Sequence, residues 1–324
     1  SVIESTQEPA PGMEALPSSV IESSKPSSVD KFYAEAQANL SEDFYLLYRI
    51  VDRLARANAL DELSWRVRLG QEAGSTATDM NTLTLETGVM DQFYGDNAAL
   101  ACMVGRQMAS HTLNHPATAA EFENRARTLM AEAEAQAIAE IQSAQRRRTR
   151  TNTLGSIVGG VLGGILGGTT GTIVGGATQA ILGTMTTSQQ QQAEVRANQI
   201  YQDSVNALNA EYAVILQRQA HEADVYAYQY MVRAGFDPQG CQRAISTLIQ
   251  LESYRLPGQV PGNPTARLQR FNALAAQVNL ETLVAEGRTQ LSTNVQPLGY
   301  GVSRDGTMLR VESRNGSNAS EFPY

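Results

Sequence analysis

Apolar residues recur every three or four positions from residue 29 to residue 59, which predicts one or two helices. Two short segments alternate apolar and polar residues instead, Trp65–Leu69 and Thr82–Leu85, as strands of a small sheet do. A third alternating stretch, residues 298–311, turns at residues 304–306. It predicts a β-hairpin that closes the core or adds a strand to a neighbour.

Asp96 precedes another helical stretch and is expected to cap it. That helix should run toward His115 and end at Pro116, because proline cannot continue a helix. Further on, residues 117–150 and 188–220 are rich in Ala, Glu, Gln and Arg and carry apolar stripes at helical spacing. We expect these two segments to form a long antiparallel helical hairpin.

The segment between these two helices, residues 151–193, contains no charged residue. Glycine occupies every fourth position in part of it: Gly155, Gly159, Gly163, Gly167, Gly171 and Gly175. Glycines at this spacing share one helical face and let two backbones approach closely, as in helices that associate within membranes. The regular spacing argues against a flexible loop. Two interpretations remain open: the glycine zipper enters a membrane, or it packs inside an oligomer.

Charge and composition narrow the class of protein. The 324 residues include 25 Lys and Arg against 33 Asp and Glu, a net charge of −8. Binding to a nucleic-acid backbone needs clustered positive charge, so we expect no nucleic-acid partner. The two cysteines, Cys102 and Cys241, are too few for a disulfide framework or a four-cysteine zinc site, and their redox state stays open.

Two segments in order resemble a known family. The first, residues 99–115, reads ALACMVGRQMASHTLNH, and the second, residues 221–238, begins with HEAD and ends with AGFDP. They resemble the GHExxH helix and the ExxxD and AG(Y/F)DP signature of membrane-associated zinc metallopeptidases related to the CAAX prenyl endopeptidase, HtpX and BepA. The resemblance covers roughly residues 39–274.

In that family two histidines one helical turn apart hold zinc, a glutamate between them activates water, and a third ligand comes from another helix. At the matching positions this chain has Arg106, Gln107, Ser110 and Ala220. Gln107 cannot act as a base, and the Arg106 cation opposes Zn²⁺. Asp224 of the second motif remains, but it supports and orients. The resemblance therefore implies that catalysis has been lost.

Displaced zinc ligands are the alternative to this loss. All three histidines, His111, His115 and His221, lie within or beside the two motifs, and the first two have i, i+4 spacing. However, the pair is turned by roughly 140° from the face that carried the old ligands, at about 100° per residue. No glutamate follows His111 to serve as a base. We therefore expect no cofactor, with zinc on these three histidines as the alternative.

The fold expected from both arguments is α+β and mostly α. It combines a zincin-like metallopeptidase core containing a small sheet with a long antiparallel helical hairpin tipped by a glycine zipper. The expected division is a disordered or surface-bound leader (1–30), two halves of the peptidase-like core (31–116 and 221–284), the hairpin (117–220, tip 151–187), and a C-terminal β-hairpin and tail (285–324).

The function expected is that of a catalytically inactive metallopeptidase-like protein, a membrane-associated, oligomeric scaffold of a bacterial cell envelope. Its old cleft would hold a peptide or protein, because Arg106 and Gln107 can hydrogen-bond extended backbone. Partners would be copies of itself or a related subunit, and the location periplasmic or membrane-associated after removal of a signal peptide. The alternatives are a pore- or ring-forming component anchored by the glycine zipper, and an active zinc endopeptidase with displaced ligands.

Overall fold

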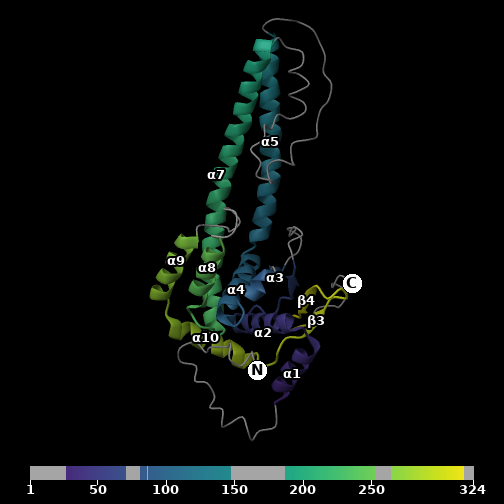
Figure 1. Cartoon of the computed structure of the whole chain (residues 1–324), viewed down its shortest axis with the longest axis vertical. Coiled ribbons are helices and arrows are strands. Elements are labelled where there is room, and N and C mark those ends of the chain that lie inside the picture. Colours follow the sequence, from purple (N-terminus) through teal and green to yellow (C-terminus); the bar gives the residue numbers. More distant parts are fainter. Residues whose placement is uncertain (1–26, 71–80, 86, 147–186, 253–263, 317–324) are drawn as a thin grey trace. The chain divides into compact units, whose positions relative to one another are not determined.

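The computed structural model describes residues 27–70, 81–85, 87–146, 187–252 and 264–316. The predicted glycine zipper, Gly155 to Gly175, and most of the predicted leader lie outside the described residues. The described chain is mostly helical with one small mixed sheet, an α+β fold dominated by helix (Figure 1).

The elements have the following bounds. The helices are α1 (Ser28–Asn39), α2 (Glu42–Ala57), α3 (Thr87–Gln92), α4 (Asn97–Thr112), α5 (His115–Arg146), α7 (Thr187–Arg233), α8 (Gly240–Glu252), α9 (Pro264–Gln277) and α10 (Leu280–Thr293). The strands are β1 (Trp65–Leu69), β2 (Thr82–Leu85), β3 (Tyr300–Val302) and β4 (Met308–Val311).

The four strands form a single sheet in the order β2-β1-β4-β3. Strand β1 pairs in parallel with β2 and antiparallel with β4, so that Arg68 lies opposite both Thr84 and Met308. The C-terminal hairpin therefore joins the same sheet as β1. Strand β2 lies at an edge, and one side of its backbone faces away from β1.

Two caps divide the first helical stretch into two helices. Ser27 and Asp30 form a reciprocal capping box at the start of α1. Leu40 is extended, with φ −102° and ψ 152°, and ends that helix. The Ser41 hydroxyl then accepts a hydrogen bond of 3.3 Å from the Phe44 amide and starts α2.

Helix α4 begins as predicted but ends earlier. The Asp96 carboxylate accepts a 3.1 Å hydrogen bond from the Ala99 amide, the expected N-cap. The helix ends at Thr112, and Asn114 takes a left-handed conformation with φ 59°. Pro116 therefore does not end α4; it lies in the first turn of α5, where the missing amide hydrogen costs nothing.

The chain divides into two compact units, and the first comprises residues 1–116 and 217–324. In it α2 packs against β4 and α10, and α4 against β2 and α8, so that these two helices lie between the sheet and α8–α10 (Figure 1). The largest fully buried side chains include Trp65, Tyr48 and Phe271. A disulfide between Cys102 and Cys241 joins α4 to α8.

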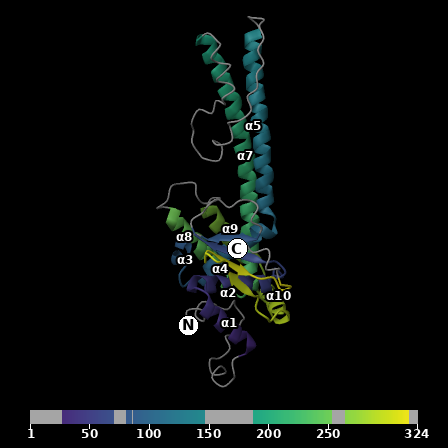
Figure 2. The same ribbon diagram turned by 90° about the vertical axis from the view of Figure 1, so that its right-hand side faces the viewer.

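The second unit, residues 117–216, contains most of α5 and the first part of α7. The Phe122 and Tyr212 rings stack with centroids 4.0 Å apart, and Arg196 pairs with Glu140 at 3.1 Å. Residue numbers rise along one helix as they fall along the other, so the two helices are antiparallel (Figure 2). Within the described ranges, no helix combines the length and apolar character that crossing a membrane requires.

Candidate functional site

A buried carboxylate, Asp224, organises the site that the two motifs predict. Its side chain is 1% exposed and lies on α7. Arg267 of α9 donates hydrogen bonds of 2.8 Å and 2.7 Å to the two carboxylate oxygens, and Arg106 of α4 donates one of 3.0 Å. The guanidinium of Arg270 lies 3.8 Å from the same carboxylate. We call these four residues the Asp224 cluster.

Positive charge exceeds negative charge in the Asp224 cluster. Three guanidinium groups face one carboxylate, and these arginines form no other ion pair within the described ranges. Burial lowers the pKa of Arg106, and the neighbouring Arg267 lowers it further, while Asp224 opposes the change. The four side chains of the cluster thus have a net charge of +2.

Gln107, which the resemblance matches to the catalytic glutamate, is bound to the sheet edge. Its amide oxygen accepts a 2.8 Å hydrogen bond from the Thr84 amide, and its amide nitrogen donates one of 2.8 Å to the Thr84 carbonyl. Gln107 does hydrogen-bond extended backbone, as expected, but that backbone is the chain's own strand β2. Both ends of its amide are therefore already hydrogen-bonded within the chain and do not remain for a bound peptide.

His111 lies one turn further along α4 and also faces β2. Its Nδ1 accepts a 3.2 Å hydrogen bond from the Asn81 amide, so Nε2 carries the proton that is donated to the Thr82 carbonyl at 3.0 Å. Burial lowers the pKa of His111, partly offset by the bond to Thr82. The neutral ring is thus the form that these contacts hold.

The remaining predicted positions have separate surroundings. Ser110 donates to the Arg106 carbonyl at 3.1 Å, a bond within α4, and Ala220 is buried on α7. His115 lies 3.2 Å from a carboxylate oxygen of Glu222, and His221 is exposed. Across the described ranges, no three His, Cys, Asp or Glu side chains converge as a metal-binding group. The zinc alternative stays a prediction without structural support.

Helix α4 must approach α7 closely for Arg106 to reach Asp224. Gly105 lies at this contact: a Cβ there would lie 3.6 Å from the Ala227 carbonyl oxygen, an ordinary van der Waals distance, so the approach does not require glycine. The adjacent Cys102 ties the same helix to α8 through the disulfide. Helix α4 therefore lies against α7 at Gly105 and is covalently joined to α8 through Cys102.

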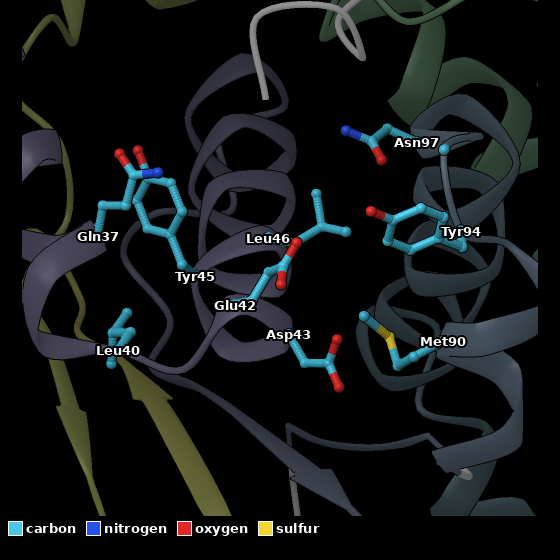
Figure 3. Close-up of a pocket in the computed structure, with 10 residues that line it drawn as sticks. Gln37, Leu40, Glu42, Asp43, Tyr45, Leu46, Met90, Tyr94 and Asn97 are labelled. Carbon is cyan, nitrogen blue, oxygen red and sulfur yellow. The ribbon is translucent and has the colours of Figure 1, made fainter. Parts of the chain in front are cut away.

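A pocket of about 300 Å³ lies elsewhere in the first unit and shares no residue with the Asp224 cluster. Figure 3 shows Leu46 of α2 facing Tyr94 and Asn97 across it. The buried Asn97 amide oxygen has no hydrogen-bond partner among the described residues. Partial burial, with Asp91 and Glu42 nearby, raises the pKa of the Asp43 carboxyl at its rim.

Periodicity and motif matching missed two members of the site, Arg267 and Arg270. Both lie on α9 and are separated from Asp224 by more than 40 residues, so no local pattern joins them. One signal was available, because two arginines three residues apart on a helix lie on the same face. That signal alone does not identify Asp224 as the residue that this face of α9 contacts.

Comparison of the chain with protein-family models, with curated proteins and with solved structures finds no match.

Proposed function

We propose that this protein is a catalytically inactive relative of the zinc metallopeptidases and that it serves as a binding or assembly scaffold of a bacterial cell envelope. The ion pair between Arg106 and Asp224 carries the proposal. A metal site needs ligands that donate electron pairs, and a guanidinium has none to donate. Its positive charge instead pairs with Asp224, the residue of the second motif that this chain keeps.

The geometry around Gln107 supports the same proposal. Peptide hydrolysis requires a group that removes a proton from water, and a glutamine amide does not do this. Both ends of the Gln107 amide are bound to Thr84. The side chain that replaces the base therefore holds the sheet edge against α4.

The disulfide supports an extracytoplasmic location. Disulfides form and persist in oxidising compartments such as the bacterial periplasm and are rare in the cytosol. Cys102 and Cys241 are the only cysteines in the chain, and they are joined. The proposed association with a membrane or with other copies rests on the glycine-rich run, residues 151–187, of which the structure describes only Thr187.

The first test measures zinc and proteolysis on protein purified without added metal or chelator. We expect zinc far below one ion per chain and no hydrolysis of an unfolded protein substrate above the rate without protein. About one zinc per chain, lost in His111→Ala and in His221→Ala, would instead support displaced ligands and overturn the proposal.

A reconstructed variant tests the ancestry itself. Arg106→His, Gln107→Glu, Ser110→His and Ala220→Glu together restore the HExxH motif and the third ligand. If the fold descends from these enzymes, the folded variant should bind one Zn²⁺ tightly, with about tetrahedral N and O coordination by X-ray absorption. A folded variant that binds no more zinc than the wild type would remove the argument for metallopeptidase ancestry.

Assembly is tested by mass in solution. Multi-angle light scattering with and without detergent should show a discrete oligomer larger than the 35.0 kDa chain. A monomer under both conditions would contradict the scaffold built from several copies. It would leave the loss of catalysis untouched.

A further inference from the structure

The Asp224 cluster contains hydrogen-bond donors that nothing described satisfies. Each guanidinium presents five N–H donors. Within the described residues, Arg106 uses only its Nε, on Asp224. The Nε of Arg270 is buried and has no hydrogen-bond partner in the part of the chain that the structure describes. A buried donor without an acceptor is unfavourable, more so when it is charged, so the cluster gains from an acceptor.

The charge of the cluster specifies the sign of that acceptor. Arg106, Arg267 and Arg270 contribute three positive charges and Asp224 one negative charge, which leaves two in excess. Like charges crowded in a partly buried site repel one another, and the lowered pKa of Arg106 reports this repulsion together with burial. An anion placed among the arginines would relieve it.

Access to the cluster differs among its arginines. The Arg267 side chain is 2% exposed, whereas those of Arg106 and Arg270 are 21% and 33% exposed. Arg267 is therefore the buried anchor of Asp224, and the other two guanidiniums have surface that a ligand can reach. Guanidinium groups bind carboxylates through two parallel hydrogen bonds, a geometry that lysine lacks.

The neighbouring sheet edge is closed to one recurring mode of peptide binding. In that mode an extended peptide adds to a free edge through backbone hydrogen bonds. On β2, however, Gln107 occupies the Thr84 amide and carbonyl, and His111 occupies the Thr82 carbonyl. A ligand beside α4 would therefore be recognised by side chains, and among the described residues of the Asp224 cluster those with unused donors are Arg106 and Arg270.

We propose that Arg106 and Arg270 bind a carboxylate group of a peptide or protein partner, with Arg267 and Asp224 holding the two arginines in place. The peptide as carrier of the carboxylate rests on the proposed binding function. A C-terminal carboxylate and an Asp or Glu side chain share the same chemistry, and the test separates them.

The experiment titrates three short peptides into the full-length protein by isothermal titration calorimetry. The peptides are acetyl-trialanine with a free C-terminal carboxylate, its C-terminal amide, and the amide of acetyl-Ala-Glu-Ala. We expect at least one carboxylate peptide to bind about tenfold more tightly than the uncharged amide, with affinity falling as salt rises. The tighter of the two identifies the source of the carboxylate.

Arg270→Gln is the diagnostic variant. It leaves the hydrogen bonds of Arg106 and Arg267 to Asp224 intact, so the protein should fold. Lys31→Gln is the matched control, because it removes the same charge from an exposed position on α1. We expect Arg270→Gln to lose about fivefold or more in carboxylate affinity, and Lys31→Gln to bind like the wild type.

Two results would overturn the proposal. One is equal binding, or no binding, of charged and uncharged peptides by the folded wild type. The other is an equal loss of affinity in Arg270→Gln and Lys31→Gln, which would indicate only nonspecific attraction to net charge. Neither result bears on zinc content or proteolysis. Conversely, a zinc-loaded, proteolytic protein would overturn the proposed function even if carboxylates bind.

Discussion

At the scale of single residues, Asp224 receives hydrogen bonds from two arginines that lie 118 and 43 residues away along the chain. A buried carboxylate is stable only when it is paired and hydrogen-bonded. Here the partners are charged guanidinium groups, that of Arg106 on α4 and that of Arg267 on α9. Asp224 therefore does more for the fold than a polar residue at the surface. Among the described residues, it is the one carboxylate that pairs with the three arginines of α4 and α9.

Replacing Asp224 should be strongly destabilising. Asp224→Asn keeps the shape but leaves the guanidiniums without a counter-charge, and we expect a loss of about 3–5 kcal/mol in the free energy of unfolding. Urea unfolding followed by circular dichroism measures the change. Asp203→Asn, at an exposed position on α7, is the control. A change below about 1 kcal/mol for Asp224→Asn would mean that the arginines are satisfied without it.

His111 should make stability depend on pH. Burial lowers its pKa, so the folded state binds this proton less readily than the unfolded state does. The free energy of unfolding should therefore fall as the pH drops below about 6.5, the ordinary histidine pKa, and be highest above it. His111→Gln, which keeps a donor and an acceptor, should flatten this part of the profile. His221→Gln, at an exposed position, should not.

At the scale of elements, α4 makes four kinds of contact with its neighbours. Gln107 and His111 hold β2, Arg106 reaches Asp224, Gly105 lies against α7, and Cys102 is joined to α8. A helix with so many fixed contacts has little freedom to shift when a ligand arrives. The site is therefore expected to bind by rigid recognition, with side-chain rather than helix movement.

Local pattern predicted part of this arrangement. The alternation in Trp65–Leu69 and the cap at Asp96 were sufficient for β1 and for the start of α4, because both depend on neighbours in sequence. The parallel pairing of β1 with β2, and the contact of Arg267 with Asp224, depend on residues far apart in the chain. Periodicity does not contain that information, so neither could be predicted.

A close approach between helices should be sensitive to one methyl group. A Cβ at Gly287 of α10 would overlap the carbonyl of Arg233 at the end of α7, whereas a Cβ at Gly105 would meet only an ordinary contact. We expect Gly287→Ala to destabilise the protein by about 1–3 kcal/mol. Gly105→Ala should be close to neutral, since alanine also favours helix. Thermal unfolding of both variants gives the comparison, and equal effects would contradict the packing argument.

At the scale of the whole molecule, the buried apolar cluster of the first unit contains none of the described residues of the second unit, 117–146 and 187–216. This unit therefore has a core of its own. The contact between His115 and Glu222 brings the ends of the intervening segment together within the first unit. A short connection can replace the helical pair without stretching the chain.

Removal of the second unit should leave the first one folded. We expect a variant in which a short Gly-Ser linker replaces residues 117–216 to keep the near-ultraviolet circular dichroism of the buried aromatic residues and to unfold cooperatively. If assembly depends on the removed segment, the variant should also be monomeric by light scattering. Loss of cooperative unfolding would show that the second unit contributes to the core of the first.

The disulfide should contribute to the stability of the whole chain. It closes a loop of 139 residues that includes the entire second unit, and loops of this length restrict the unfolded state strongly. We expect Cys102→Ala with Cys241→Ala to lower the free energy of unfolding by about 2–5 kcal/mol. Wild-type protein should show a similar loss in reductant. A double variant that is insensitive to reductant yet as stable as the oxidised wild type would contradict this expectation.

The guanidinium of Arg106 is covalently part of the polypeptide, whereas a metal ion must be taken up from solution. Its charge cannot be removed by a chelator, exchanged for another ion, or lost when zinc is scarce. A binding site built around such a permanent cation keeps its charge when metal is removed, a condition that inactivates a zinc enzyme. Under the proposed function, binding of the partner would therefore not depend on the supply of metal.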